Sequence, residues 1–117
     1  MAIMVKDLAE KLNLQVAGGK AGLDRAVLNG YCGDLLSEIM GNAPESCVWI
    51  TVQGHQNIIA VAVLREMAAI VIAGGHQPDA ETLDKAEKEG IPLLLWPGSS
   101  FDLAARLNRI GVGSQAE

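Results

Sequence analysis

The sequence predicts an α/β fold, a single three-layer α/β/α domain with a mostly parallel but mixed five-stranded sheet. Apolar runs that end near glycine or proline alternate along the chain with amphipathic stretches, which is the pattern of alternating strands and helices. The clearest run, residues 69–73, is continuously aliphatic, as expected for a strand buried on both faces of a sheet. A length of 117 residues suits one domain.

The first part of the chain predicts one helix and two strands. Apolar residues recur there at helical spacing: Val5, Leu8, Ala9 and Leu12. We expect Asn13 to end this helix. Residues 14–17 and 26–31 have the pattern of strands, and because only a turn separates them we expect them to pair antiparallel. That pair would make the sheet mixed.

The middle of the chain predicts a short helix, two strands and a buried helix between them. Asp34 is expected to be the N-cap of a helix over residues 35–40. Residues 47–52 are rich in β-branched and aromatic side chains and predict a strand. The next apolar segment is ambiguous, but helix-forming residues follow it directly. We therefore expect a buried helix over residues 56–67 that leads into the strand at residues 69–73.

The last third predicts helix, strand and helix. Residues 78–89 carry oppositely charged side chains four residues apart, which favours an exposed helix. Residues 92–96 predict a strand, and Ser99 is expected to cap a final helix. We expect the domain to span residues 1–111 and residues 112–117 to form a flexible C-terminal tail.

Composition limits the possible partners. The formal net charge is −5 and the nine Lys and Arg residues are scattered, which argues against nucleic acid and anionic membrane surfaces as partners. The chain starts without the pattern of a secretory signal, and no apolar stretch has the length and composition of a membrane span. We therefore expect a cytoplasmic protein. Cys32 and Cys47 match no metal motif, and we expect both to be buried free thiols.

Polar loops follow the three strands that we expect to be parallel. Because parallel strands end at one edge of a sheet, these loops should converge there. They contain Gly54, His55, Gln56, Asn57, Gly74, Gly75, His76, Ser99 and Ser100. Each loop leads into a helix N-terminus, where backbone amides and the helix dipole favour an anion. This pattern predicts a binding site for a phosphate, carboxylate or nucleotide. The alternative is that the loops are only turns.

No complete catalytic motif accompanies these loops. The glycines form neither a P-loop nor a dinucleotide fingerprint. His55 and His76 would need a third ligand to hold a metal, and no spacing specifies one. We expect no catalytic residue, no metal and no cofactor. An apolar helix in so short a chain also favours a homodimer, whose surface the pattern does not specify.

Four segments carry a resemblance to a known family. They are Gly30-Tyr-Cys-Gly-Asp-Leu-Leu-Ser37, Val48-Trp-Ile-Thr-Val52, Ala69 to Gly75 and Gly90-Ile-Pro-Leu93. In order and spacing, over nearly the whole chain, they resemble a DRTGG domain. Related domains occur as regulatory modules in HPr kinases, long phosphotransacetylases and nucleotide-regulated inorganic pyrophosphatases. The resemblance implies an α/β/α fold similar to the N-terminal domain of HPr kinase, and dimerisation or regulation in place of catalysis.

The chain departs from the family motif at two places. Only Gly74 and Gly75 remain of the Thr-Gly-Gly element, since Ala73 replaces the threonine. Residues 54–57 occupy the loop where Asp-Arg would lie. The resemblance therefore implies no anion contact from that arginine, and His55 is the nearest cationic substitute.

Three hypotheses follow. The first is a dimeric, non-catalytic regulatory module that binds a small anionic metabolite or nucleotide. The second is a protein–protein adaptor subunit of a metabolic or redox enzyme complex, without ligand binding. The third is a small enzyme that uses His55 or His76.

Overall fold

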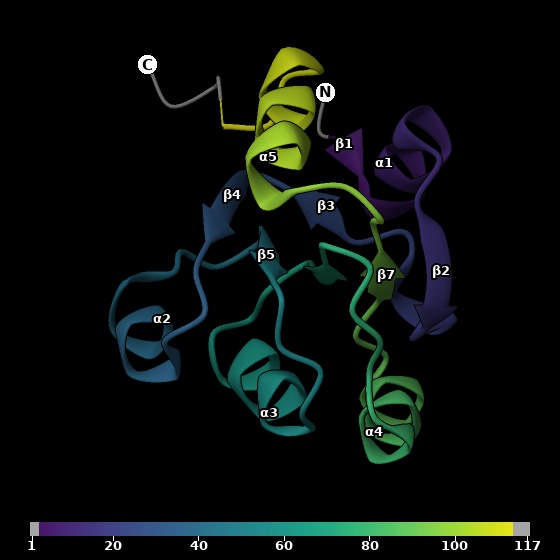
Figure 1. Ribbon diagram of the computed structural model, residues 1–117, viewed down its shortest axis with the longest axis vertical. Coiled ribbons are helices and arrows are strands. Elements are labelled where there is room, and N and C mark those ends of the chain that lie inside the picture. Colours follow the sequence, from purple (N-terminus) through teal and green to yellow (C-terminus); the bar gives the residue numbers. More distant parts are fainter. Residues whose placement is uncertain (1–2, 114–117) are drawn as a thin grey trace.

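The computed structural model describes residues 3–113 (Figure 1). Its helices are α1 (Val5–Leu12), η1 (Lys20–Gly22, a 3₁₀ turn), α2 (Leu36–Asn42), α3 (Asn57–Leu64), α4 (Ala80–Glu89) and α5 (Ser100–Arg109). Its strands are β1 (Ile3–Met4), β2 (Gln15–Gly18), β3 (Ala26–Val27), β4 (Asn29–Cys32), β5 (Cys47–Thr51), β6 (Ala69–Ile72) and β7 (Leu93–Leu95).

The predicted fold class is confirmed. A five-stranded sheet in the order β2-β7-β6-β5-β4 lies between α1 and α5 on one side and α2, α3 and α4 on the other (Figure 1). Each face of the sheet has its own buried cluster. One cluster joins the sheet to α2, α3 and α4, and the other joins it to α1 and α5. Both faces of β5 and β6 are buried, which explains their continuous apolar sequences.

The sheet is mixed for a different reason from the one predicted. Strands β4, β5, β6 and β7 are parallel, and β2 pairs antiparallel with β7. The expected pairing between residues 14–17 and 26–31 is wrong, because β2 and β4 lie at opposite edges. The 3₁₀ turn η1 directs the chain away from β2. Residues 26–31 then divide into β3, which pairs with β1, and β4.

Most helix boundaries agree with the sequence. Helix α1 ends at Asn13, which adopts a left-handed conformation with φ of 56°. The ambiguous apolar segment forms α3, with Ile58 and Ile59 buried, but this helix ends at Leu64 and not at residue 67. Residues 65–68 turn the chain into β6, and Glu66 there has φ of 52°. At the start of α5, the Ser99 hydroxyl accepts a hydrogen bond from the Asp102 amide at 3.1 Å, as expected of an N-cap.

Asp34 does not cap α2, so that prediction is wrong. The residue at the N-cap position is Leu35. The Asp34 carboxylate accepts hydrogen bonds from the Thr51 hydroxyl at 2.8 Å and from the Val52 amide at 2.9 Å. Asp34 thus links the end of β4 to the end of β5. Two donors on the neighbouring strand outcompete the local helix amides for this carboxylate.

Val112, the first residue of the predicted tail, packs against the rest of the protein. Val112 is buried, and its amide donates to the Leu107 carbonyl at 3.0 Å. This part of the predicted tail therefore packs with α5. Residues 114–117, the remainder of that tail, lie outside the described residues. Among the described helices, none is long and apolar enough to cross a membrane.

Both cysteines are free thiols, but only Cys47 is buried. The prediction that Cys32 is buried is wrong, because Cys32 lies on the edge strand β4 and is exposed. Burial raises the pKa of the Cys47 thiol from 9.0 to about 11, since the thiolate is poorly solvated there. The folded protein therefore holds this proton more tightly than the unfolded chain.

The raised pKa of Cys47 predicts a loss of stability in alkali. The unfolded chain releases the proton near pH 9 and the folded protein only near pH 11, so the stabilisation is complete below this window and lost through it. We expect the free energy of unfolding to fall by about 3 kcal/mol from this group. Urea unfolding of the protein and of Cys47→Ala between pH 9 and pH 11 measures the effect. The free energy of unfolding should fall more steeply with pH in the protein than in the variant. Equal pH dependence in the two proteins would contradict it.

Candidate functional site

The carboxyl ends of β5, β6 and β7 bring three polar loops side by side. The Gly54 carbonyl accepts hydrogen bonds from the Asp79 amide at 3.0 Å and from the buried Thr82 hydroxyl at 2.6 Å. These bonds join the loop after β5 to the start of α4. A Cβ at Gly54 would lie 2.5 Å from the Gln77 carbonyl oxygen, so only glycine permits this approach.

Gly74 and Gly75 turn the chain after β6 and use their amides in doing so. Both have positive φ, 78° and 77°. The Gly74 amide donates to the Gly98 carbonyl at 2.8 Å, and the Gly75 amide donates to the Trp96 carbonyl at 3.4 Å. The two amides therefore join the loops after β6 and β7. They do not form an open cradle for an anion.

Other predicted site residues also make internal contacts. His55 is exposed, and its Nδ1 accepts a hydrogen bond from the Asn57 amide at 3.1 Å. Gln56 is half-buried at the N-cap position of α3. The Ser99 hydroxyl is engaged in capping α5, and Ser100 is the first residue of that helix.

A cavity of about 270 Å³ lies at this edge, beside β7 and the start of β2. Gly75 and His76 line it, and they are the predicted site residues that do so. The other lining residues are Asn13, Gln15, Gln77, Leu95, Trp96 and Pro97. The cavity therefore draws on β2 and the end of α1 as well as on the loops after β6 and β7.

Sequence reasoning missed the contribution of β2. Because β2 runs antiparallel to β7, with Gln15 opposite Leu95, its first residues lie at the edge where β7 ends. Asn13 and Gln15 carry no local signal of this role. Knowledge of the pairing partner of β2 would have identified them.

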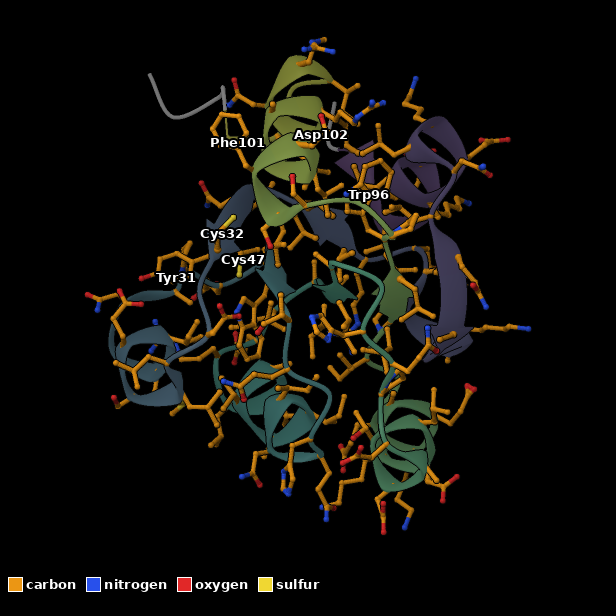
Figure 2. All side chains as sticks on the ribbon, in the orientation of Figure 1. Tyr31, Cys32, Cys47, Trp96, Phe101 and Asp102 are labelled. Carbon is orange, nitrogen blue, oxygen red and sulfur yellow. The ribbon has the colours of Figure 1, made fainter. Side chains whose placement is uncertain are left out.

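Trp96 is fixed in place beside the cavity by contacts with α5. Its indole Nε1–H donates to the Ser99 carbonyl at 3.1 Å, and the Arg106 guanidinium carbon lies 5.4 Å from the ring centroid. Arg106 in turn forms an ion pair with Asp102 at 3.1 Å. Figure 2 shows Trp96 on the side of the sheet that α1 and α5 cover. Trp96 forms part of the wall of the cavity.

The chemistry of the cavity suits binding better than catalysis. Among residues 3–113, its lining contains neutral amides, one histidine and aromatic or aliphatic surface, and no carboxylate. No cluster of three or more His, Cys, Asp and Glu side chains that could hold a metal ion occurs among residues 3–113. Asn and Gln side chains both donate and accept hydrogen bonds, which suits the polar edge of a base or sugar.

Comparisons with known proteins agree with this fold. Residues 7–110 match the family described as DRTGG domain. A similar solved structure contains the CBS and DRTGG domains of the regulatory region of Clostridium perfringens pyrophosphatase, complexed with the activator diadenosine tetraphosphate. The TM-score is 0.67 at 18% identity, over 87% of this chain. The chain spans 44% of the length of that structure. No curated protein matches the sequence.

Proposed function

This chain belongs to the DRTGG domain family, and we propose on that basis that it is a cytoplasmic, non-catalytic regulatory module that binds a small anionic ligand. Within the predicted class of nucleotides and phosphorylated metabolites, we propose a nucleotide. The observation that carries this choice is the cavity at the carboxyl edge of the sheet, in which Gly75 and His76 meet Trp96.

The cavity offers a separate contact to each part of a nucleotide. The Trp96 ring provides an aromatic surface on which a base can stack. Asn13, Gln15 and Gln77 provide donors and acceptors for its polar edge. In the part of the chain that the structure describes, His76 is the one ionisable side chain that lines the cavity, and we assign it to the phosphate. The activator bound to the similar pyrophosphatase region is also an adenine nucleotide, which supports the same class of ligand.

We also propose that the chain forms a homodimer. Large apolar side chains remain exposed on its surface, among them Phe101 at 86% and Leu35 at 67%. Burying such side chains against a second copy would remove them from water. In a regulatory domain, ligand binding must change how the domain contacts a partner. A dimer interface is one surface through which such a change can act.

Nucleotide binding is expected to raise the melting temperature and to depend on His76. At a ligand concentration about 100 times the dissociation constant, stabilisation should be about 2.7 kcal/mol. Thermal unfolding with AMP, ADP and ATP measures it, with acetyl phosphate and glucose 6-phosphate as phosphates without a base. His76→Ala should weaken binding about tenfold, or about 1.4 kcal/mol.

The chain supplies a matched control in its second histidine. His55 is exposed in the neighbouring loop and does not line the cavity, so His55→Ala should leave the affinity unchanged. Stabilisation by no nucleotide, or equal losses in the two variants, would contradict this site. Sedimentation equilibrium of the same samples tests the homodimer, and a monomer at every concentration would count against it.

A further inference from the structure

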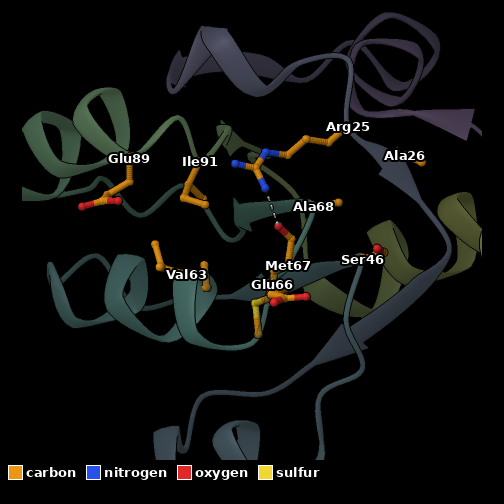
Figure 3. A pocket seen from close by; sticks show the side chains of 10 residues that line it. Arg25, Ala26, Ser46, Val63, Glu66, Met67, Ala68, Glu89 and Ile91 are labelled. Carbon is orange, nitrogen blue, oxygen red and sulfur yellow. Dashed lines mark hydrogen bonds between the residues drawn. The ribbon is translucent and has the colours of Figure 1, made fainter.

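A second cavity, of about 450 Å³, lies at the opposite edge of the sheet, where β5, β6 and β7 begin (Figure 3). Its volume is in the range of about 300–1,000 Å³ that is usual for small-molecule sites. Its walls come from the segment before β3, from the ends of α3 and α4, and from the residues that precede the three strands. None of the predicted site residues lines it.

Arg25 is the cation of this cavity, and the fold directs its side chain inward. The Arg25 backbone is held on both sides, since its amide donates to the Gly22 carbonyl and its carbonyl accepts from the Val5 amide, both at 3.0 Å. A Cβ at Gly22 would lie 2.8 Å from Arg25 Nε and 2.3 Å from the Gly90 carbonyl oxygen. Glycine at position 22 therefore leaves the space through which the Arg25 side chain passes.

Most of the hydrogen-bonding capacity of Arg25 is unused. Its Nη1 donates to the Met67 carbonyl at 3.5 Å, a long contact that Figure 3 shows across the cavity. Within the described residues the one ion pair joins Arg106 to Asp102, so Arg25 has no carboxylate within 4.0 Å. A half-buried guanidinium with several free donors is suited to bind a carboxylate in two-point fashion.

Two acidic residues, both exposed, also belong to the walls of this cavity. Glu66 and Glu89 lie at the ends of α3 and α4, where helix C-termini also favour a cation. The Glu66 carbonyl accepts from the Ser46 amide at 2.8 Å, which fixes the left-handed backbone of Glu66, with φ of 52°. Arg65 does not neutralise this charge, because its guanidinium donates to the Ala43 carbonyl.

The ligand class follows from these charges. One guanidinium and two carboxylates give this cavity a net negative charge, which disfavours a phosphate dianion. Val63 and Ile91 add apolar surface to its walls. We propose that this cavity binds a free α-amino acid with an apolar side chain. Its carboxylate binds Arg25 and its ammonium group lies toward Glu66.

The probe for this site is L-leucine, compared with two molecules that each lack one charged group. These are 4-methylpentanoate, which has no ammonium group, and 3-methylbutylamine, which has no carboxylate. Isothermal titration of the whole chain should show leucine binding at least about tenfold more tightly than either. Inorganic phosphate should not bind at this cavity. Equal affinity for leucine and either half-molecule, or no heat with leucine, would overturn the proposal.

Variants then locate the binding. Arg25→Gln and Glu66→Gln should each weaken leucine binding about tenfold, while Arg109→Gln, an exposed arginine on α5, should not change it. Should Arg25→Gln fail to fold, Arg25→Lys keeps the charge but loses the two-point geometry, and should also weaken binding. His76→Ala should leave leucine binding intact, so this test is independent of the nucleotide site. Leucine binding that survives the Arg25 substitution would place the ligand elsewhere.

Discussion

Trp49→Ala is expected to lower the free energy of unfolding by about 4 kcal/mol, a large share of the stability of a domain of this size. Trp49 is fully buried in β5, opposite Tyr31 of β4 and Ile70 of β6. Its indole Nε1–H also donates to the Gly33 carbonyl at 2.9 Å. Alanine would leave a large cavity in the cluster beneath α2 and α3, and the Gly33 carbonyl would lose its donor.

Two further variants separate the contributions to this loss. Trp49→Phe keeps most of the apolar volume and removes the hydrogen bond, so it should cost about 1–2 kcal/mol. Phe101→Ala, at a low protein concentration where self-association is negligible, should change the free energy by less than about 0.5 kcal/mol, because that ring is 86% exposed. Urea unfolding measures all three. A loss for Trp49→Ala no larger than for Phe101→Ala would contradict the assigned packing.

Features that depend on neighbouring residues could be predicted from the sequence. Helix α1 and its end at Asn13 follow from apolar spacing and a residue that tolerates a left-handed backbone. The Ser99 cap follows from a hydroxyl placed just before a helix. The ambiguous apolar segment is correctly predicted as helix α3, but the helix ends at Leu64 and not at residue 67. Residues 65–68, which were expected to favour helix, form the turn into β6, with Glu66 at φ of 52°. For α1 and the Ser99 cap, the deciding contacts lie within about one turn of the chain.

Features that depend on distant partners were predicted wrongly. The partner of β2 is β7, about 80 residues away, and no local pattern indicates that pairing. Asp34 is a residue type that commonly caps helices, but its carboxylate accepts hydrogen bonds from Thr51 and Val52 at the end of the adjacent strand. Cys32 has an apolar character that suggests burial, and its exposure results from the place of β4 at the edge of the sheet.

In the candidate site, too, only part of the arrangement could be predicted. The three loops converge because parallel strands end at the same edge of the sheet. Whether their backbone amides are free to bind a ligand depends on hydrogen bonds between the loops. Two consecutive glycines after a strand predict backbone amides that are free to bind an anion. The amides of Gly74 and Gly75 instead donate hydrogen bonds to Gly98 and Trp96. The contributions of Asn13 and Gln15 to the cavity could not be recognised before the pairing of β2 was known.

The cavity around Arg25 has no sequence motif at all. Arg25, Glu66 and Glu89 come from three separate segments, and each taken alone resembles an ordinary surface charge. The sheet brings them together because the segments that precede parallel strands meet at one edge. Parallel strands thus give the sheet two edges with clustered loops. The nucleotide cavity lies at the carboxyl ends of the strands, and the chemically different Arg25 cavity lies at their amino ends.

Gly19→Ala is expected to destabilise the protein by about 3 kcal/mol or more, for two reasons that add. Gly19 has φ of 71°, a conformation that disfavours any side chain. A Cβ there would also lie 1.9 Å from the Ile91 carbonyl oxygen, so the backbone before β7 would have to move. The same movement would disturb the antiparallel pairing of β2 with β7 and, through Ile91, the Arg25 cavity.

Two other glycines separate the conformational cost from the steric one. Gly75→Ala meets nothing within 4 Å but has φ of 77°, so it should cost about 1 kcal/mol. Gly41→Ala also meets nothing within 4 Å and lies inside α2, so it should stabilise the protein by about 0.5–1 kcal/mol. Urea unfolding should therefore give the lowest free energy of unfolding for Gly19→Ala and the highest for Gly41→Ala. If Gly19→Ala and Gly75→Ala lose the same stability, the close contact with Ile91 has no energetic consequence and the packing of β2 beside β7 is looser than the structure indicates.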